Sequence, residues 1–427
     1  MIPRLMKSVA ALMPLCASLL TAQPSIGGDW QMSYRQLNGV QYFIFHIDQS
    51  GDQLSGTFAG NVKLTGTIRN GAIEAKTDEA GRKGTLVATV KGDEMEGRGQ
   101  DEDGPFTFVA RIPRAATVSA RSHQFTPTEF HNYFNGNTPP ALRINSGDTV
   151  ATRSVDAGGT DENGKRVARG GNPLTGPFYI EGAWPGDVIA VKLVRVRLNR
   201  NSALSGRSIV PSALTSSYYR DARFDDKFNS EWKIDADAGL ARLAKPTDRL
   251  KDFAIALKPM LGCIGVAPPQ EQSFRSGFLG AYGGNMDYNQ FVEGVTIYLP
   301  VFHPGALLYL GDAHAAQGDG ELTGDALETS AEFSITVTLV KDKHIAGPRA
   351  ENAQYRMASG IANSLPDALQ QATTNLARWL EEDYKLTPNE TALVLGTSIH
   401  YDIAEVVDPY VHVVARIEKG TLARIRP

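Results

Sequence analysis

The chain has 427 residues, of which 42% are hydrophobic and 21% charged, and its formal net charge is −4. This length favours more than one domain, and the composition allows large buried cores. The charge balance excludes a strongly basic nucleic-acid-binding surface, and no long run of like charge indicates an interaction tail.

The first 22 residues predict a secretory signal peptide. Arg4 and Lys7 form its basic start, residues 8–20 form an apolar segment too short to span a bilayer, and Ala22 supplies a small residue at the cleavage site. We therefore expect a periplasmic or secreted protein with no membrane span. Lipidation at Cys16 is a weaker alternative, because a leucine precedes it where a small residue is required.

Removal of the signal leaves Cys263 as the only cysteine, which excludes an internal disulfide. Its neighbours in "LGCIGVAPP" are apolar. A reactive thiol needs an electropositive setting, so we expect a buried and inert side chain.

Residues 24–113 predict a separate accessory domain of antiparallel β-strands. Short alternating segments are punctuated by "QSGDQ", "AGN", "RNG", "EAG", "KGDE" and "EDG", as in a meander that forms a small sheet or barrel. Acids and histidines do not cluster here, and His46 is interpreted as a packed or surface residue. Residues 114–120 are the expected linker.

The second domain, residues 121–427, is predicted to be mainly β. "GDVIAVKLVRVRL" and "EFSITVTLVK" read as strands, and a period of two places Phe333, Ile335, Val337 and Leu339 on one face. No alternation of strands with helices is present before the C-terminal part. A β-sandwich is therefore expected.

Two helices are predicted near the C-terminus. Ser364 with Asp367, and Thr387 with Glu390, have the spacing of N-terminal capping boxes. The first helix should bury one apolar stripe. Its members are Leu369, Ala372, Leu376, Trp379 and Leu380.

Acids and histidines gather in a few glycine-flanked stretches of the second domain. "GDAHAAQGDGE", residues 311–321, holds three carboxylates, one histidine and three glycines. Acids placed so close repel one another unless a positive charge lies between them. Other stretches add further candidates, which are His131, Asp156, Glu181, Asp187, Asn285, Asp287, His303, Glu328 and Glu332.

Taken in order, several segments resemble the acetamidase/formamidase family and cover nearly all of residues 121–427. They are "PPALRINSGDTV", "SVDAGG", "NPLTGPFYIEGAWPGD", "LGCIGVAPP", "GGNMD", "LPVFHPGALLYLGDAHAAQGDGE" and "LVLGTSIHYDIAEVVD". The resemblance implies a β-rich homo-oligomeric hydrolase. It implies cleavage of a small linear amide such as formamide or acetamide to the acid and ammonia. It also implies a divalent metal, commonly zinc. Calcium at a second site is a further option. Trp184 and His303 depart from the family pattern, which bears on specificity.

The residues allow this chemistry, because a catalytic zinc takes about three protein ligands from histidine and carboxylates. If residues 311–315 are extended, Asp312 and His314 share one face and can ligate together. We predict Asp156, Asp312 and His314 as ligands, with His131 as a further candidate.

The remaining roles follow from hydrolysis. Glu321 is predicted as the general base, with Glu181 as the next candidate. Asn285 or a backbone N–H would stabilise the oxyanion. Asp287 and Asp319 would orient these groups.

Plainer interpretations stay open at this point. A hydrogen-bonded pair would also explain Asp312 and His314. A solvated turn would explain Asp319 and Glu321. Asp156 and Asp287 would suit turns, and His131 a structural role. A lactam hydrolase or a non-catalytic amide-binding protein on the same fold are the alternative functions. A serine nucleophile elbow is missing from the sequence.

Overall fold

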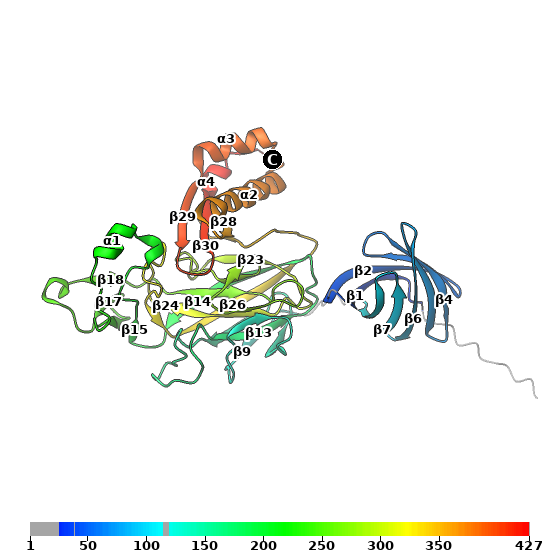
Figure 1. Ribbon diagram of the computed structural model, residues 1–427, viewed down its shortest axis with the longest axis horizontal. Coiled ribbons are helices and arrows are strands. Elements are labelled where there is room, and N and C mark those ends of the chain that lie inside the picture. The colour runs from blue at the N-terminus through cyan, green and yellow to red at the C-terminus, as the bar shows by residue number, and fades with distance from the viewer. Residues whose placement is uncertain (1–24, 38, 114–118, 427) are drawn as a thin grey trace, which may run out of the picture. The chain divides into compact units, whose positions relative to one another are not determined.

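The computed structural model describes residues 25–37, 39–113 and 119–426. The predicted signal peptide and most of the predicted linker lie outside these ranges. The chain divides into two compact units, Met1–Asn38 with Phe43–Ile112, and Gly39–Tyr42 with Pro113–Pro427 (Figure 1). Each unit is described below by itself.

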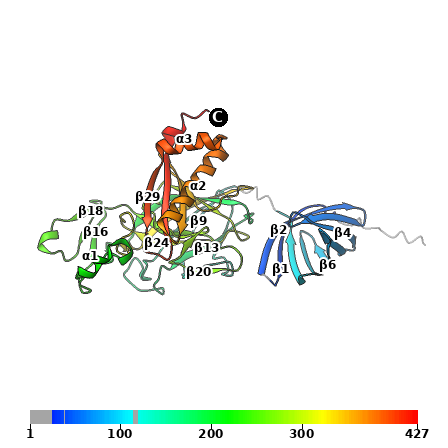
Figure 2. The ribbon, with the colours of Figure 1, turned by 45° about the horizontal axis from the view of Figure 1, so that its top comes forward.

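The first unit is a closed barrel of antiparallel strands, whose curved wall is visible in Figure 2. In order, the strands are β1 (Gly28–Gln36), β2 (Gly39–Ser50), β3 (Gln53–Phe58), β4 (Val62–Arg69), β5 (Ala72–Glu79), β6 (Arg82–Lys91), β7 (Glu94–Asp101) and β8 (Gly104–Arg111). β1 pairs with β8, which closes the barrel. Trp30, Met32 and Phe45 are each 1% exposed inside it. Side chains thus fill the interior, as an eight-stranded barrel allows, and the predicted antiparallel unit is confirmed.

The second unit contains two large sheets. The strands of one sheet are β11 (Leu142–Ile144), β13 (Leu174–Ile180), β15 (Ser202–Leu204), β16 (Glu231–Asp235), β17 (Leu240–Leu243), β18 (Ala254–Ala256), β19 (Met260–Gly265), β21 (Leu279–Gly280), β22 (Gly283–Asn285), β24 (Leu308–His314) and β25 (Glu328–Thr329). The strands of the other are β9 (Ser122–Gln124), β12 (Thr149–Arg153), β14 (Val188–Leu198), β23 (Thr296–Pro300), β26 (Ala331–Val340), β27 (Arg349–Glu351), β28 (Tyr355–Ala362), β29 (His400–Glu405) and β30 (Val411–Glu418). A small pair is formed by β10 (Tyr133–Asn135) and β20 (Ser273–Arg275).

One hydrophobic core joins the two large sheets. Phe333 and Ile335 of β26 belong to the same buried cluster as Phe178 of β13 and Leu310 of β24. The period of two predicted for β26 is observed, although Leu339 at its end is only partly buried. The mainly β, sandwich-like prediction is therefore confirmed.

Both predicted C-terminal helices are present, α2 (Leu365–Tyr384) and α3 (Pro388–Ser398). Two further short helices are α1 (Ser216–Asp221) and α4 (Lys419–Leu422), with 3₁₀ turns at Pro211–Ala213 and Asp248–Leu250. The Ser364 side chain accepts from the Asp367 N–H, and Thr387 with Glu390 forms the full capping box. In the described part of the chain, no helix is both long and apolar enough to cross a membrane.

Helix α2 packs closely on β28, and the two elements lie next to each other in Figure 1. A Cβ on Gly360 of β28 would lie 1.9 Å from the Ala368 carbonyl oxygen, so only glycine fits there. The predicted stripe needs one correction. Leu369 is 42% exposed, and Ala368 takes its place against the sheet.

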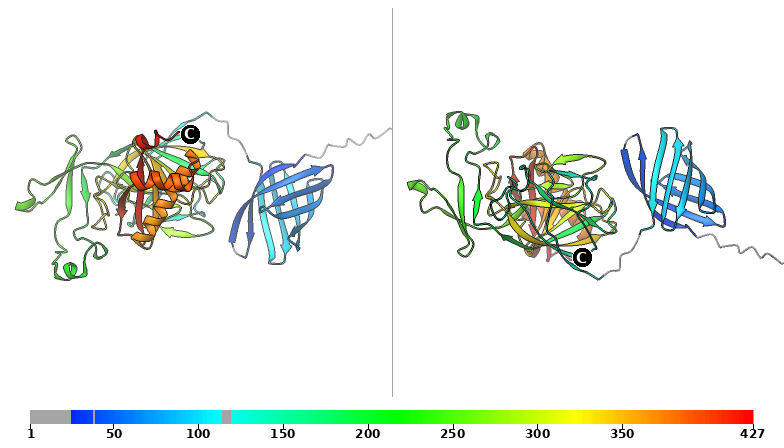
Figure 3. Two further views of the ribbon diagram at one scale, coloured as in Figure 1. Left: turned by 90° about the horizontal axis from the view of Figure 1, so that it is seen from above. Right: turned by 90° about the horizontal axis from the view of Figure 1, so that it is seen from below.

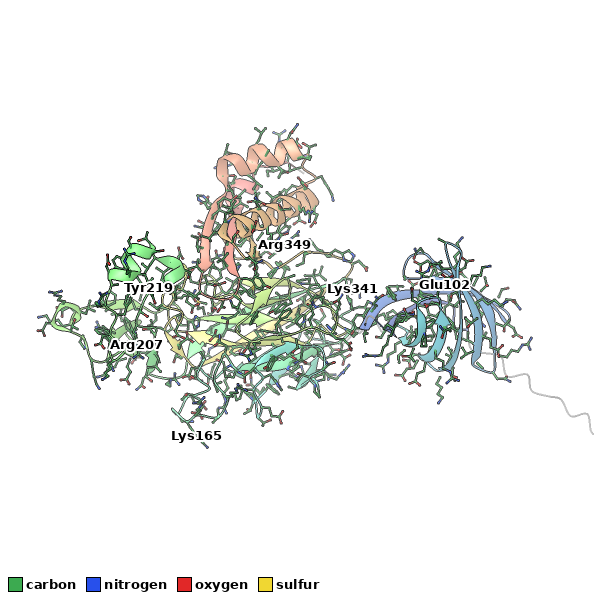
Figure 4. All side chains as sticks on the ribbon, viewed as in Figure 1. Glu102, Lys165, Arg207, Tyr219, Lys341 and Arg349 are labelled. Carbon is green, nitrogen blue, oxygen red and sulfur yellow. The ribbon has the colours of Figure 1, made fainter. Side chains whose placement is uncertain are left out.

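Charged side chains also hold α2. Arg349 lies below α2 (Figure 4), where its guanidinium is 3.0 Å from the Glu382 carboxylate and stacks 5.3 Å from the centroid of Trp379. These contacts tie β27 to the last turns of the helix.

The sequence analysis missed an excursion between β14 and β19, which carries β15–β18 and α1 and projects from the sandwich (Figures 1 and 3). Its own core is small and centres on Trp232 and Ile234. Tyr219, labelled in Figure 4, is 45% exposed on α1.

Candidate functional site

Four chain segments bring acids and a histidine together inside the sandwich. β24 carries Asp312 and ends at His314. β25 pairs with it, so that Glu328 lies opposite His314. β22 ends at Asn285 and leads to Asp287, and Glu321 follows β24 in the chain.

The side chains of this cluster are almost fully buried. Asp287 and His314 are 1% exposed and Asp312 is 2% exposed. The Nε2 atom of His314 lies 3.6 Å from Asp312 Oδ1 and 3.1 Å from Glu328 Oε1, and its Nδ1 lies 3.9 Å from Asp287 Oδ1. Two overlapping sets therefore have ligand atoms within 4.8 Å of one another, namely Asp287–Asp312–His314 and His314–Glu321–Glu328.

Several of these buried atoms find no hydrogen-bond partner among the residues that the structure describes. They are both carboxylate oxygens of Asp287, Oδ1 of Asp312, Nε2 of His314 and Oε2 of Glu328. An unpaired buried polar atom costs about 1–3 kcal/mol, and more when charged. Carboxylates and an imidazole nitrogen are also the donors that zinc takes. The residues present therefore fit a divalent cation.

The electrostatics of the cluster agree with this fit. Burial, reinforced by the charges of Glu321 and Asp312, raises the pKa of Asp287 well above its usual range. Burial likewise raises the pKa of Glu321 well above its usual range and that of Glu328 to about 7. Burial alone would lower the pKa of His314, but the carboxylates of Glu328 and Asp312 raise it well above its usual range. Buried acids thus crowd around one position that favours positive charge.

Two backbone features shape the cluster. Gly262 of β19 lies so close that a Cβ on it would be 2.1 Å from Asp287 Oδ1 and 3.1 Å from Asp312 Oδ2. Asp312 itself adopts a left-handed backbone with φ of 57°. Our assumption of a regular extended segment at 311–315 was therefore wrong in detail, although Asp312 and His314 do meet.

Asn285 is held beside the cluster by three partners. Its Oδ1 accepts from Asn172 at 3.1 Å and from the Cys263 thiol, whose Sγ is 2.6 Å away, and its Nδ2 donates to Asp408 at 2.7 Å. Asn172 also donates to Asp312 Oδ2 at 2.9 Å. One N–H of Asn285 has no assigned acceptor among the described residues, so it can donate to a ligand.

Cys263 is fully buried, and burial raises the pKa of its thiol well above the usual range. This position matches the predicted inert thiol rather than a nucleophile.

Two of the predicted residues, Asp156 and Glu181, lie outside both sets and have other partners. Asp156 forms an ion pair with Arg200, 2.7 Å from its Oδ2, while its Oδ1 accepts from the Thr160 N–H. Glu181 is 36% exposed and holds Arg143 through both oxygens. Because these carboxylates are already engaged, we no longer assign Asp156 as a ligand or Glu181 as a base.

His131 is also not brought into either set. Its backbone bridges Leu174, its ring packs 6.3 Å from that of Tyr309, and burial lowers its pKa. These contacts suit the structural interpretation, and we no longer assign His131 as a ligand. Asp319 is exposed and accepts from Asn289 Nδ2 at 2.7 Å.

Trp184 and His303, the two residues expected to depart from the family pattern, are buried. The backbone N–H of Trp184 donates to Asp187, and His303 Nε2 lies 2.7 Å from the Pro268 carbonyl oxygen. Their effect on specificity stays a prediction.

Sequence reasoning missed Asp287 as a candidate ligand and gave Glu328, Asn172 and Asp408 no role. Asp287 and Glu328 both had a visible signal, as acids in or next to the glycine-flanked stretches. Glu328 lies opposite His314 through strand pairing, which the sequence does not reveal.

The second unit is similar in sequence to proteins of a known family. The family model described as "Acetamidase/Formamidase family" matches residues 118–275 and 280–411. A formamidase from Methylophilus methylotrophus is 22% identical over 267 residues, which are 50% of this chain and 65% of that protein. The chain thus spans just under two thirds of the length of this relative.

Solved structures similar to this chain carry related names. An acetamidase from Yersinia enterocolitica is 28% identical with a TM-score of 0.62, covering 73% of this chain and 96% of its own. A recombinant predicted acetamidase/formamidase from Thermoanaerobacter tengcongensis is 26% identical with a TM-score of 0.62, covering 72% and 99%.

Proposed function

Because the chain belongs to the acetamidase/formamidase family, we propose that it hydrolyses a small linear amide to the carboxylic acid and ammonia with the help of a divalent cation. The similarity to a formamidase and to an acetamidase supports the reaction class. The main support for a bound cation is the buried carboxylate of Asp287, which lies beside Asp312 and His314 and has no hydrogen-bond partner among the described residues.

Asp287, Asp312 and His314 would hold the cation, and zinc suits this donor set. A cation bound there supplies Lewis acidity, which polarises an amide carbonyl and lowers the pKa of water. We assign no residues to a second site for calcium.

The other residues of the site would act on protons and on the substrate oxygen. Glu321 would take a proton from the attacking water and return it to the leaving nitrogen, so that ammonia departs. The remaining N–H of Asn285 would donate to the carbonyl oxygen as negative charge develops there. The bonds from Asn172 and Asp408 keep Asn285 in this orientation.

Two further proposals concern the whole protein. The first 22 residues would direct export, so mature protein should begin near Gln23. The chain would assemble as a homo-oligomer, which sedimentation of the purified protein would show.

The test is ammonia release from formamide, acetamide and propionamide, measured with zinc and after removal of metal by a chelator. The proposal expects turnover of at least one amide that is lost on chelation and restored by zinc. Ring opening of a lactam without turnover of linear amides would instead favour the cyclic-amide alternative. Turnover that is unaffected by chelation would contradict the metal-dependent route.

A further inference from the structure

Gln317 connects three parts of the candidate site through its side-chain amide. Its Nε2 donates to the Asp287 carbonyl oxygen and, at 3.3 Å, to the Ala404 carbonyl oxygen. Its Oε1 lies 2.9 Å from His314 Nδ1. The loop that carries Asp287, the end of β24 and strand β29 thus meet at one amide group.

These contacts fix which way the amide points. Two carbonyl oxygens can only accept, so the NH₂ group must face them and the amide oxygen must face His314. An amide oxygen also only accepts, so His314 must carry its proton on Nδ1. When a cation binds, the ring must be neutral, and its lone pair is then on Nε2. This atom faces Asp312 and Glu328 and has no hydrogen-bond partner among the described residues.

We propose that Gln317 is a positioning residue, which fixes the ring orientation and tautomer of His314 so that Nε2 can bind the divalent cation. This inference rests on the metal site of the proposed function. Hydrogen bonds to the second nitrogen of a histidine ligand typically contribute 10–100-fold to metal affinity. Gln317 also anchors the backbone of Asp287, so one side chain aligns two ligands.

If Gln317 only fills space, its variants should rank in a different order of metal affinity. Q317L keeps the approximate size and removes the acceptor, whereas Q317E keeps the acceptor and adds a charge. Because Gln317 is only half-buried, the charge of Q317E retains contact with water. Positioning predicts that Q317E binds metal more tightly than Q317L, and space filling predicts the reverse.

N289A is the matched control. Asn289 donates to the backbone oxygen of Gln317 and to Asp319, so it orders the same loop without reaching the His314 ring. If loop order alone matters, N289A should weaken metal binding as much as Q317L does.

The experiment measures the Zn²⁺ dissociation constant of the full-length, metal-free protein by competition with a chromophoric chelator. Q317L, and Q317M as a second apolar variant, should bind Zn²⁺ about 10–100-fold more weakly than the wild type. Q317E should bind more tightly than both, and N289A should match the wild type. Thermal unfolding of each metal-free variant verifies that it is folded.

Wild-type affinity in a folded Q317L or Q317M, or tighter binding by Q317L than by Q317E, would overturn the inference. So would a wild-type protein that binds no Zn²⁺. Amide turnover is assayed in the same samples. If the predicted order of affinities holds without turnover of any amide, the role of Gln317 stands and the proposed amidase reaction fails.

Discussion

The replacement of Gly262 by alanine tests the geometry of the site most sharply. The added Cβ would lie 2.1 Å from Asp287 Oδ1, with Asp312 Oδ2 at 3.1 Å and His314 Cε1 at 3.2 Å. The backbone of Gly262 is not in the left-handed region, so the strain comes from the collision alone. All three proposed ligands meet the new methyl group.

The expected loss follows from the displacement. Real Cβ atoms essentially never approach other heavy atoms within 3.0 Å, so Asp287 must move by about 1 Å, and misplacement on that scale can cost on the order of 10²-fold in rate. We expect G262A to lose at least that factor in kcat/KM for the amide that the wild type hydrolyses, together with weaker Zn²⁺ binding. Overpacking should also cost about 1–3 kcal/mol of unfolding free energy.

Two glycine variants separate site geometry from general damage. A Cβ on Gly318, in the loop that leads to Glu321, meets nothing within 4 Å, so G318A should retain activity. A Cβ on Gly265, in the same strand as Gly262, would meet the Gly284 nitrogen at 2.6 Å and Phe134 at 2.9 Å. G265A should therefore lose stability without displacing the ligands directly. A folded G262A with wild-type turnover and zinc content would show that Asp287, Asp312 and His314 do not form the metal site.

Three further predictions concern the base, a core histidine and the barrel. E321Q should retain its metal while kcat falls by about 10²–10⁴-fold, because the amide cannot accept the proton; loss of metal would instead make Glu321 a ligand. Burial lowers the pKa of His412 to about 4, so the unfolded chain binds its proton first as the pH falls below about 6.5. Neutral His412 therefore stabilises the protein above that pH. Up to about 3 kcal/mol of the free energy of unfolding is lost between pH 6.5 and 4. Urea unfolding of the wild type and of H412Q over this pH range should show this loss in the difference between the two proteins. Deletion of residues 23–113 should leave amide turnover largely in place, and a folded but inactive truncation would show that the barrel contributes to catalysis.

Local patterns could be predicted from the sequence because they depend on near neighbours. Turns at regular spacing gave the strands of the barrel, and the capping pairs at Ser364 and Thr387 gave both helix starts. Leu369 was misplaced, since a stripe of helical period does not reveal which of two adjacent residues faces the sheet.

The candidate site was only half predictable, because its members meet through strand pairing. Asp312 and His314 were found from one short segment. Asp156 looked equally suitable, but Arg200, 44 residues later in the chain, engages its carboxylate. Glu328 and Asp287 reach His314 only through the fold of the sandwich, and no local spacing reveals such contacts.

The central claim is that Asp287, Asp312 and His314 hold a divalent cation that amide hydrolysis requires. Metal analysis of the purified protein beside H314A, with ammonia release measured on the same samples, tests it most directly. We predict one tightly bound divalent cation at this site per wild-type chain, and loss of both that cation and turnover in a folded H314A. Full metal content and full turnover in H314A would contradict it.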